Sequence, residues 1–450
     1  MSDNQTWLQR SFNAVWHPCT QMKRHEALPI VPIASAEGVW LTDFDGKRYL
    51  DGVSSWCVNL FGHGHPRIKQ AIKNQLDSLE HVMLAGFTHR PVVELSERLA
   101  EASGLAHAFY GSDGASATEI ALKMSFHYWR NKGLPGKKRF ISLENSYHGE
   151  TVGALAVTDV PLFSHTYAEL LKPGLRAPSP DARRAELGQS AADVALAAIQ
   201  SMEKLLTEHA GEVAAVIVEP LVQGAAGMAM YDPLYLSELR RLCDQFQVHL
   251  IADEIAVGFG RTGSLFACQQ AGITPDFLCL SKGITGGFLP LSCVLTSSPI
   301  YQAFYHDDVS RGFLHSHSYT GNALACAAAL AVLDIFAEED VLTQNAAKAA
   351  RFDAMMAGLQ ARPDVRDFRR IGMIWAFEIA TRRADFAQAC FAAILRRGCL
   401  LRPIGNTIYF MPPYTICDEE MAFLIAATTA ALDELAHASN SPDGHGIALP

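Results

Sequence analysis

The sequence predicts an α/β fold, with a large domain built on a mostly parallel, doubly wound sheet and a smaller α+β domain formed from both termini. Short apolar or β-branched runs alternate with longer helical patterns from about residue 65 to residue 340. Several runs are apolar throughout, which is typical of parallel strands covered on both faces. After residue 340 the pattern changes to helix, short strands and helix. Such alternation favours one sheet with right-handed crossovers.

The elements can be assigned in chain order. Residues 38–43 indicate a small sheet outside the main alternation, and the Pro/Ser/Asp-rich stretch 177–182 predicts an exposed loop. The strands expected in the large domain are residues 107–110, 139–143, 214–219, 249–253, 277–281 and 292–296. The helices expected between them include residues 115–131 and 235–245. The elements expected in the small domain are helices 341–359, 385–397 and 418–436 and strands 371–379 and 407–411.

These patterns divide the chain into four parts. Residues 1–64 form a segment that joins the small domain, and residues 65–340 form the large domain. Residues 341–437 form the C-terminal small domain, and residues 438–450, rich in Ser, Asn, Pro and Gly, predict a loose tail.

Composition excludes several classes of protein. Of the 450 residues, 49% are hydrophobic and 19% charged, so the chain can bury a large core. Its net charge of −10, with arginine pairs scattered along the chain, argues against a nucleic-acid surface. The longest apolar run, residues 323–333, is too short to cross a membrane.

The cellular compartment is inferred from the cysteines and the N-terminus. The ten cysteines show no C-x-x-C spacing, and most lie in apolar runs, which suits a reducing compartment. The first residues lack the basic and apolar regions of a signal peptide. We therefore expect a cytoplasmic protein.

Two predicted strands end in residues suited to catalysis. One runs into Asp253-Glu254, and the next ends in Ser281-Lys282-Gly283. Because ligands of open α/β sheets bind at the carboxyl ends of strands, an acid and a lysine there can face one crevice. Two charges capping strand ends in solvent are the alternative.

The nearby Gly258-Phe259-Gly260-Arg261-Thr262-Gly263 matches the dinucleotide fingerprint G-x-G-x-x-G. However, Asp-Glu separates this motif from the strand, which argues against a Rossmann site.

Two further strand ends add a phosphate cradle and an aromatic ring. Gly111-Ser112-Asp113-Gly114-Ala115 precedes a helix, whose N-terminal amides can bind a phosphate, although Ser112 or Asp113 can equally be a plain N-cap. Tyr147, in the loop after the next strand, can stack on a planar ring or lie at the rim. Together these signals describe a pocket for a flat, phosphorylated cofactor that carries an aldehyde.

This set of residues resembles the class III aminotransferases, which are pyridoxal 5'-phosphate (PLP) enzymes of fold type I. The resemblance covers about residues 15 to 435. Its motifs are 253–263 with Ser281-Lys282-Gly283, 111–115, Tyr147-His148-Gly149, 219–224 and 317–322. The resemblance implies a fold type I PLP-dependent transferase that acts as a homodimer with shared active sites and needs no metal.

The resemblance also implies roles for the cofactor site. Lys282 would hold the aldehyde as a Schiff base and move the proton, while Asp253 would pair with the pyridine nitrogen. Ile255 and Tyr147 would cover the two faces of the ring. Residues expected at the phosphate are Gly114, Ala115, His317 and Ser318, the last from the partner subunit.

Within the class, three segments resemble the enzymes that aminate 8-amino-7-oxononanoate in biotin biosynthesis with S-adenosyl-L-methionine as donor. They are 16–22, 51–56 and 402–405, followed by Met411-Pro412-Pro413. The likeness implies that Arg402 grips the substrate carboxylate and Trp56 forms an aromatic wall. The substrate-binding residues expected are Cys19, Trp56, Tyr147, Ser316 and Arg402.

Three departures leave the amino donor open. Enzymes that use S-adenosylmethionine usually carry Tyr at the position of Cys19 and Trp at that of Cys57, and His317 is more like the enzymes that use lysine. The alternatives are therefore lysine as donor, or a broad ω-amine:pyruvate aminotransferase. A PLP-dependent aminomutase or decarboxylase, or an inactive PLP-binding module, would be a different class. The presence of Lys282, Asp253, Tyr147 and Arg402 argues against the inactive module.

Overall fold

The computed structural model, which describes residues 2–28 and 30–439, is organised around a seven-stranded sheet of order β4-β12-β11-β10-β7-β5-β6. Strand β12 is antiparallel to both of its neighbours, and the other pairs are parallel. The strands are β4 (His107–Gly111), β5 (Arg139–Leu143), β6 (Leu175–Ala177), β7 (Val213–Val218), β10 (His249–Asp253), β11 (Phe277–Leu280) and β12 (Ser292–Thr296). The predicted mostly parallel sheet is confirmed.

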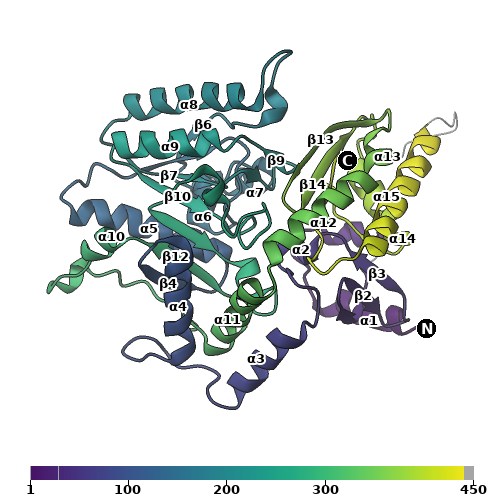
Figure 1. Ribbon diagram of the computed structural model, residues 1–450, viewed down its shortest axis with the longest axis horizontal. Coiled ribbons are helices and arrows are strands. Elements are labelled where there is room, and N and C mark those ends of the chain that lie inside the picture. Colours follow the sequence, from purple (N-terminus) through teal and green to yellow (C-terminus); the bar gives the residue numbers. More distant parts are fainter. Residues whose placement is uncertain (1, 29, 440–450) are drawn as a thin grey trace.

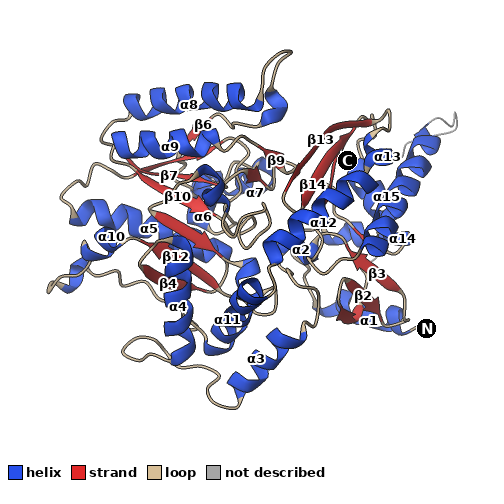
Figure 2. Cartoon of the chain, viewed as in Figure 1, coloured by secondary structure: helices blue, strands red, loops and turns tan. Residues whose placement is uncertain are grey.

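Helices cover both faces of this sheet (Figure 2). Successive strand residues point to opposite faces, so Ile251 and Phe277 pack in one cluster with helix α5 (Gly114–Asn131). Their neighbours Leu250 and Leu278 belong to the other cluster. Because both faces are buried, the strands read as continuous apolar runs.

The remaining helices of the large domain connect or cover these strands. They are α3 (Pro66–Leu76), α4 (Arg90–Ser103), α6 (Val152–Val157), α7 (Pro161–Ser164), α8 (Ala191–Glu208), α9 (Leu234–Gln245), α10 (Ser298–Gln302) and α11 (Ala323–Glu338). The short strands β8 (Val222–Gln223) and β9 (Ala229–Met230) form a separate hairpin.

The two ends of the chain meet in the smaller part of the molecule. Strands β1 (Ile33–Glu37), β2 (Trp40–Asp43) and β3 (Arg48–Asp51) form a sheet with β15 (Cys399–Leu400). Figure 1 shows the purple N-terminal strands beside the yellow helices α14 (Phe386–Arg396) and α15 (Asp418–Ser439). The other elements are α1 (Asp3–Ala14), α2 (Ser54–Cys57), α12 (Val341–Met355), α13 (Ala357–Gln360), β13 (Val365–Ile371), β14 (Ile374–Ile379) and β16 (Thr407–Phe410).

Three expectations about local structure were wrong. The strand expected at 371–379 is a hairpin of β13 and β14 that turns at Gly372, where φ is +53°. The helix expected at 341–359 divides into α12 and α13. The loop expected to be exposed at 177–182 is largely buried, because its polar side chains find partners: Ser179 donates to Gln223, and Asp181 accepts from Arg183.

The division at residues 64 and 340 stays a prediction. Apart from residues 438 and 439, which belong to α15, the expected tail lies outside the described residues. In the described part of the chain, no helix is long and apolar enough to cross a membrane.

Candidate active site

The carboxyl ends of β10 and β11 place Asp253 and Lys282 on neighbouring strands. Asp253 pairs with Cys279 in the parallel ladder, and Lys282 follows three residues after Cys279. Asp253 is buried and Lys282 half-buried. The lysine has a φ of +47°, a conformation that costs a non-glycine residue free energy and is typical of functional sites. The two charges therefore do not cap strands in open solvent.

His148 fixes the carboxylate of Asp253. Its Nδ1 donates to Asp253 Oδ2 over 2.7 Å, and the amide of Ile255 donates to Oδ1 over 3.1 Å. The His148 side chain is fully buried. Sequence reasoning gave this histidine no role, since the only signal was its place in Tyr147-His148-Gly149, far from Asp253 along the chain.

A cradle of amides forms where β4 passes into α5. Asp113 is the N-cap, and its carboxylate accepts from Ser116 N over 2.9 Å. Among the described residues, none accepts from the amides of Gly114 and Ala115, which therefore remain available at the positive end of the helix. A Cβ at Gly114 would lie 2.9 Å from Ile255 Cγ2, so only glycine leaves this space open.

Tyr147 enters the same region from the loop after β5. Its amide donates to Glu219 Oε2 (3.0 Å) and its hydroxyl donates to Glu150 Oε1 (2.9 Å). Burial, followed by Glu150, raises the pKa of the Tyr147 hydroxyl, which therefore stays protonated. Burial raises the pKa of Glu219 to about 7, against the opposing effect of His148. Glu219 and Glu150 were not singled out from the sequence.

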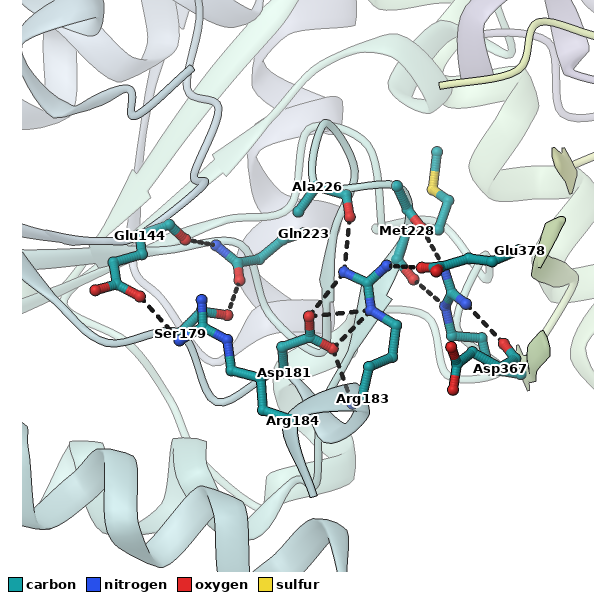
Figure 3. Close-up of polar contacts among 12 residues, drawn as sticks. Glu144, Ser179, Asp181, Arg183, Arg184, Gln223, Ala226, Met228, Asp367 and Glu378 are labelled. Carbon is teal, nitrogen blue, oxygen red and sulfur yellow. Dashed lines mark hydrogen bonds and ion pairs between the residues drawn. The ribbon is translucent and has the colours of Figure 1, made fainter. Parts of the chain in front are cut away.

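Polar contacts tie the chain around Gln223 to the start of the loop after β5 (Figure 3). Gln223, just after Glu219 in the chain, donates from Nε2 to the Glu144 carbonyl over 2.9 Å and accepts from Ser179. Glu144 also pairs with Arg184 over 2.8 Å. This network links the loop after β7 with the loop that carries Tyr147.

Arg402 and Trp56 meet at the small sheet. The Arg402 guanidinium lies over the Trp56 ring, 4.8 Å from its centroid. Strands β3 and β15 are parallel, with Asp51 opposite Leu400, and each leads directly to one of these residues. Tyr409 lies nearby: burial raises the pKa of its hydroxyl, Cys57 adds to this, and Arg402 opposes it. Sequence reasoning did not find Tyr409.

The remaining residues expected from the sequence lie at the periphery of the candidate active site. His317 Nδ1 is 3.2 Å from Ser112 Oγ in the same chain, while Ser316 and Ser318 are exposed. Cys19 is exposed and close enough to Tyr147 to contribute to the pKa shift of its hydroxyl. The described residues contain no His/Cys/Asp/Glu group able to hold a metal ion.

Comparison with known proteins assigns the chain to a family. The model of the family "Aminotransferase class-III" matches residues 21–432. The chain belongs to the class III aminotransferases, as the sheet and its strand-end lysine and aspartate suggested.

Within that class the named relatives share one activity. The chain is 47% identical over 428 residues to the adenosylmethionine-8-amino-7-oxononanoate aminotransferase of Helicobacter pylori, covering 94% of this chain and 96% of the relative. The enzyme of the same name from Geobacter sulfurreducens is 42% identical over 437 residues, covering 94% and 96%.

Solved structures agree with this fold. The adenosylmethionine-8-amino-7-oxononanoate aminotransferase of Methanocaldococcus jannaschii superposes with a TM-score of 0.89 at 36% identity, covering 96% of this chain and 99% of that one. A PLP-bound amine transaminase from an uncultivated Pseudomonas species gives 0.88 at 33% identity, covering 94% and 98%.

The residues present fit PLP. The free amides of Gly114 and Ala115 suit its phosphate, and the open space at Gly114 lets the phosphate approach. The buried carboxylate of Asp253 suits a protonated pyridine nitrogen, and the amine of Lys282 suits an aldehyde.

Proposed function

We propose that this protein transfers an amino group to 8-amino-7-oxononanoate, with S-adenosyl-L-methionine as donor and PLP as cofactor, and so makes 7,8-diaminononanoate in biotin biosynthesis. The observation that carries the proposal is the Arg402 guanidinium over Trp56, in a chain that also carries Lys282 and Asp253 at neighbouring strand ends. Relatives named for this reaction, at 47% and 42% identity, support it.

PLP, when bound, supplies an aldehyde for the amine substrate and a ring that accepts electrons. The Lys282 amine holds that aldehyde between turnovers and then, as general base and acid, moves the proton on the reacting carbon. The Asp253 carboxylate, kept in place by His148, holds the proton on the pyridine nitrogen. The amides of Gly114 and Ala115, with His317, anchor the phosphate.

At the substrate end, Arg402 binds the carboxylate of the keto acid, because a guanidinium pairs with a carboxylate through two parallel hydrogen bonds. Trp56 forms the wall beside it, and the hydroxyl of Tyr147 orients the amine. Cys19 and the backbone of Ser316 complete the pocket.

The assembly and the compartment are part of the proposal. Ser318 is exposed in the single chain, which suits a homodimer in which Ser318 of the partner subunit completes the phosphate site. All ten cysteines are free thiols, which suits the cytoplasm.

The test is a donor-dependent half-reaction followed by absorbance. The PLP-loaded enzyme is mixed separately with S-adenosyl-L-methionine, lysine and phenylethylamine, and conversion of the cofactor from its aldehyde form to its amine form is recorded. We expect S-adenosyl-L-methionine to cause the conversion and 8-amino-7-oxononanoate to reverse it. The Lys282→Ala protein is the control and should convert about 10²- to 10⁴-fold more slowly, since it lacks the group that moves the proton.

Other outcomes assign other functions. Conversion by lysine, with the same reversal, would keep the acceptor and change the donor. Conversion by phenylethylamine alone, reversed by pyruvate and not by 8-amino-7-oxononanoate, would overturn the proposal in favour of an ω-amine:pyruvate aminotransferase.

A further inference from the structure

The turn that carries Trp56 has an unusual backbone. Four consecutive residues of α2, none of them glycine, have positive φ: +50° at Ser54, +46° at Ser55, +74° at Trp56 and +67° at Cys57. L-residues avoid this left-handed conformation and rarely adopt it in succession. A strained turn persists only where the surrounding structure over-determines it, so neighbouring contacts must hold this one.

The carboxylate of Asp51 makes several of these contacts, alongside backbone bonds such as that from Cys57 N to Val53 O over 2.9 Å. It is fully buried at the end of β3. Oδ1 accepts from the amide of Ser55 over 2.9 Å and from that of Val53 over 3.4 Å. Oδ2 accepts from Ser55 Oγ over 2.7 Å and lies 3.0 Å from His63 Nε2. One side chain therefore fixes both the entry to the turn and its first half.

The same residue also sets the position of the turn relative to Arg402. Asp51 is opposite Leu400 in the parallel pair of β3 and β15, and Gly52 N donates to Leu400 O over 3.0 Å. Arg402 is two residues beyond Leu400. At the other side of the turn, Ser54 Oγ donates to Met411 O over 2.7 Å. The indole of Trp56 is half-exposed and has no hydrogen bond of its own in the described structure, so its place depends on this backbone.

We propose that Asp51 is a positioning residue of the substrate pocket: by holding the left-handed turn Ser54–Cys57, its carboxylate keeps the Trp56 ring against the Arg402 guanidinium. The inference rests on the proposed function in one respect, namely that Arg402 binds the carboxylate of the keto acid. The geometry of the turn does not depend on that assignment.

Asp43 offers a matched control. It is a buried aspartate in β2 of the same sheet, and it also accepts from two backbone amides, those of Asp45 and Lys47. A tyrosine hydroxyl, that of Tyr49, donates to it as well. Its contacts stabilise the hairpin between β2 and β3 and do not reach α2. Asp43→Ala therefore reports what loss of a buried turn-capping aspartate does to stability alone.

The experiment compares Asp51→Ala, Asp51→Asn and Asp43→Ala in the PLP-loaded enzyme. We expect Asp51→Ala to raise the KM for 8-amino-7-oxononanoate about tenfold or more with a smaller change in kcat, because substrate binding is lost through misplacement of Trp56 and Arg402. Asn keeps an acceptor for the Ser55 amide, so Asp51→Asn should stay within about threefold of the wild-type KM. Asp43→Ala should leave KM unchanged.

A second measurement needs no substrate. Acrylamide quenching of Trp56 is isolated by subtracting the fluorescence of the matching Trp56→Phe protein. We expect quenching of Trp56 to change in Asp51→Ala and not in Asp43→Ala or Asp51→Asn. If the wild type does not use 8-amino-7-oxononanoate, the proposed function fails while this measurement still tests Asp51.

Equal effects of Asp51→Ala and Asp43→Ala on KM and on quenching would overturn the inference and leave Asp51 a purely structural residue. If Asp51→Ala does not fold, Ser55→Ala and His63→Ala each remove one partner of the carboxylate. An unchanged KM and unchanged Trp56 quenching in both would overturn it equally.

Discussion

At the level of single residues, the proposed function depends on a few side chains whose immediate neighbours suit them to it. Asp253 is a suitable partner for a pyridine nitrogen because His148 holds one oxygen and the Ile255 amide holds the other. Arg402 differs, since its guanidinium is exposed and contacts the face of Trp56. Its charge is therefore free to meet an incoming carboxylate.

This exposure determines what Arg402→Ala should cost. We expect KM for the keto acid to rise by about 10- to 100-fold, corresponding to a charge-assisted hydrogen bond of roughly 1.5–3 kcal/mol in a partly solvated site. PLP affinity should not change, because Arg402 belongs to the small sheet and not to the amide cradle. Steady-state kinetics and a cofactor titration measure the two quantities.

Arg396→Ala is the control for this substitution. Arg396 is an exposed arginine that pairs with Glu434 on the surface, so its loss should alter neither quantity. An unchanged KM in Arg402→Ala would mean that the substrate carboxylate binds elsewhere.

At the scale of single elements, close packing keeps the cofactor site in shape. Gly149, in the loop after β5, has a φ of +118°, and a Cβ there would lie 2.6 Å from the Cβ of Ala115. The loop that carries Tyr147 therefore packs directly on the first turn of α5. The amide cradle at the start of α5 and the loop that carries Tyr147 are therefore packed together as one unit.

Gly149→Ala tests this unit. The new methyl group must push the first turn of α5 away, so we expect weaker PLP binding and a loss of stability of about 2–4 kcal/mol from strain and overpacking. Gly188→Ala carries a similar backbone strain, with φ +89°, but no atom lies within 4 Å of its Cβ. Thermal unfolding should show a loss in both proteins, whereas PLP titration should show a loss only in Gly149→Ala. Equal PLP affinity in the two proteins would show that the packing of the Tyr147 loop does not affect PLP binding at the amide cradle.

At the scale of the whole molecule, a half-buried polar cluster joins the loops of the seven-stranded sheet to strands β13 and β14. Arg183 pairs with Asp181 and with Glu378 of β14, and its guanidinium also donates to the Ala226 carbonyl (Figure 3). Arg369 of β13 donates to Met228 O over 2.9 Å. Burial, with Arg183 close by, lowers the pKa of Arg369 to about 10.

Glu378→Ala should therefore weaken the junction that this polar cluster forms between the sheet loops and strands β13 and β14. It leaves Arg183 and Arg369 without their shared carboxylate, and we expect the free energy of unfolding to fall by about 1–3 kcal/mol, between the values typical of surface and buried pairs. Glu434→Ala removes a carboxylate that pairs with Arg396 and Arg397 at the surface, and should cost less than about 1 kcal/mol. Urea unfolding compares the two, and equal losses would show that the cluster adds nothing to the junction.

Stability of the whole molecule should also depend on pH through Glu254. Burial raises its pKa from 4.5 to about 7, although the amides of Ala267 and Cys268 oppose the shift. The folded state therefore holds this proton more tightly than the unfolded chain. The resulting stabilisation is complete below about pH 4.5 and is lost as pH rises through 7.

Glu254→Gln removes this titration. The free energy of unfolding of the wild type, measured relative to Glu254→Gln, should fall between pH 4.5 and 7. A wild-type advantage that grows with pH would contradict the shift.

The amino-acid sequence was enough to predict the mostly parallel sheet and the strand-end positions of Lys282, Asp253 and Tyr147. Apolar runs and the residues that follow them are local signals, because both faces of such a sheet are buried and its carboxyl ends meet at one edge. The roles given to those residues, and the division of the chain into domains, stay predictions.

Which residues from distant segments come into contact depends on the folded chain. His148 pairs with Asp253, Ser54 of the Trp56 turn donates to the Met411 carbonyl, and the stretch 177–182 is buried by partners from other elements. No local pattern encodes these contacts, because a hydrogen bond between segments far apart in the chain forms only once packing has brought both partners out of water. The left-handed backbone at Trp56 is hard to predict for a related reason: its cost is local, whereas the contacts that outweigh it include one from a distant segment, Ser54 Oγ to Met411 O.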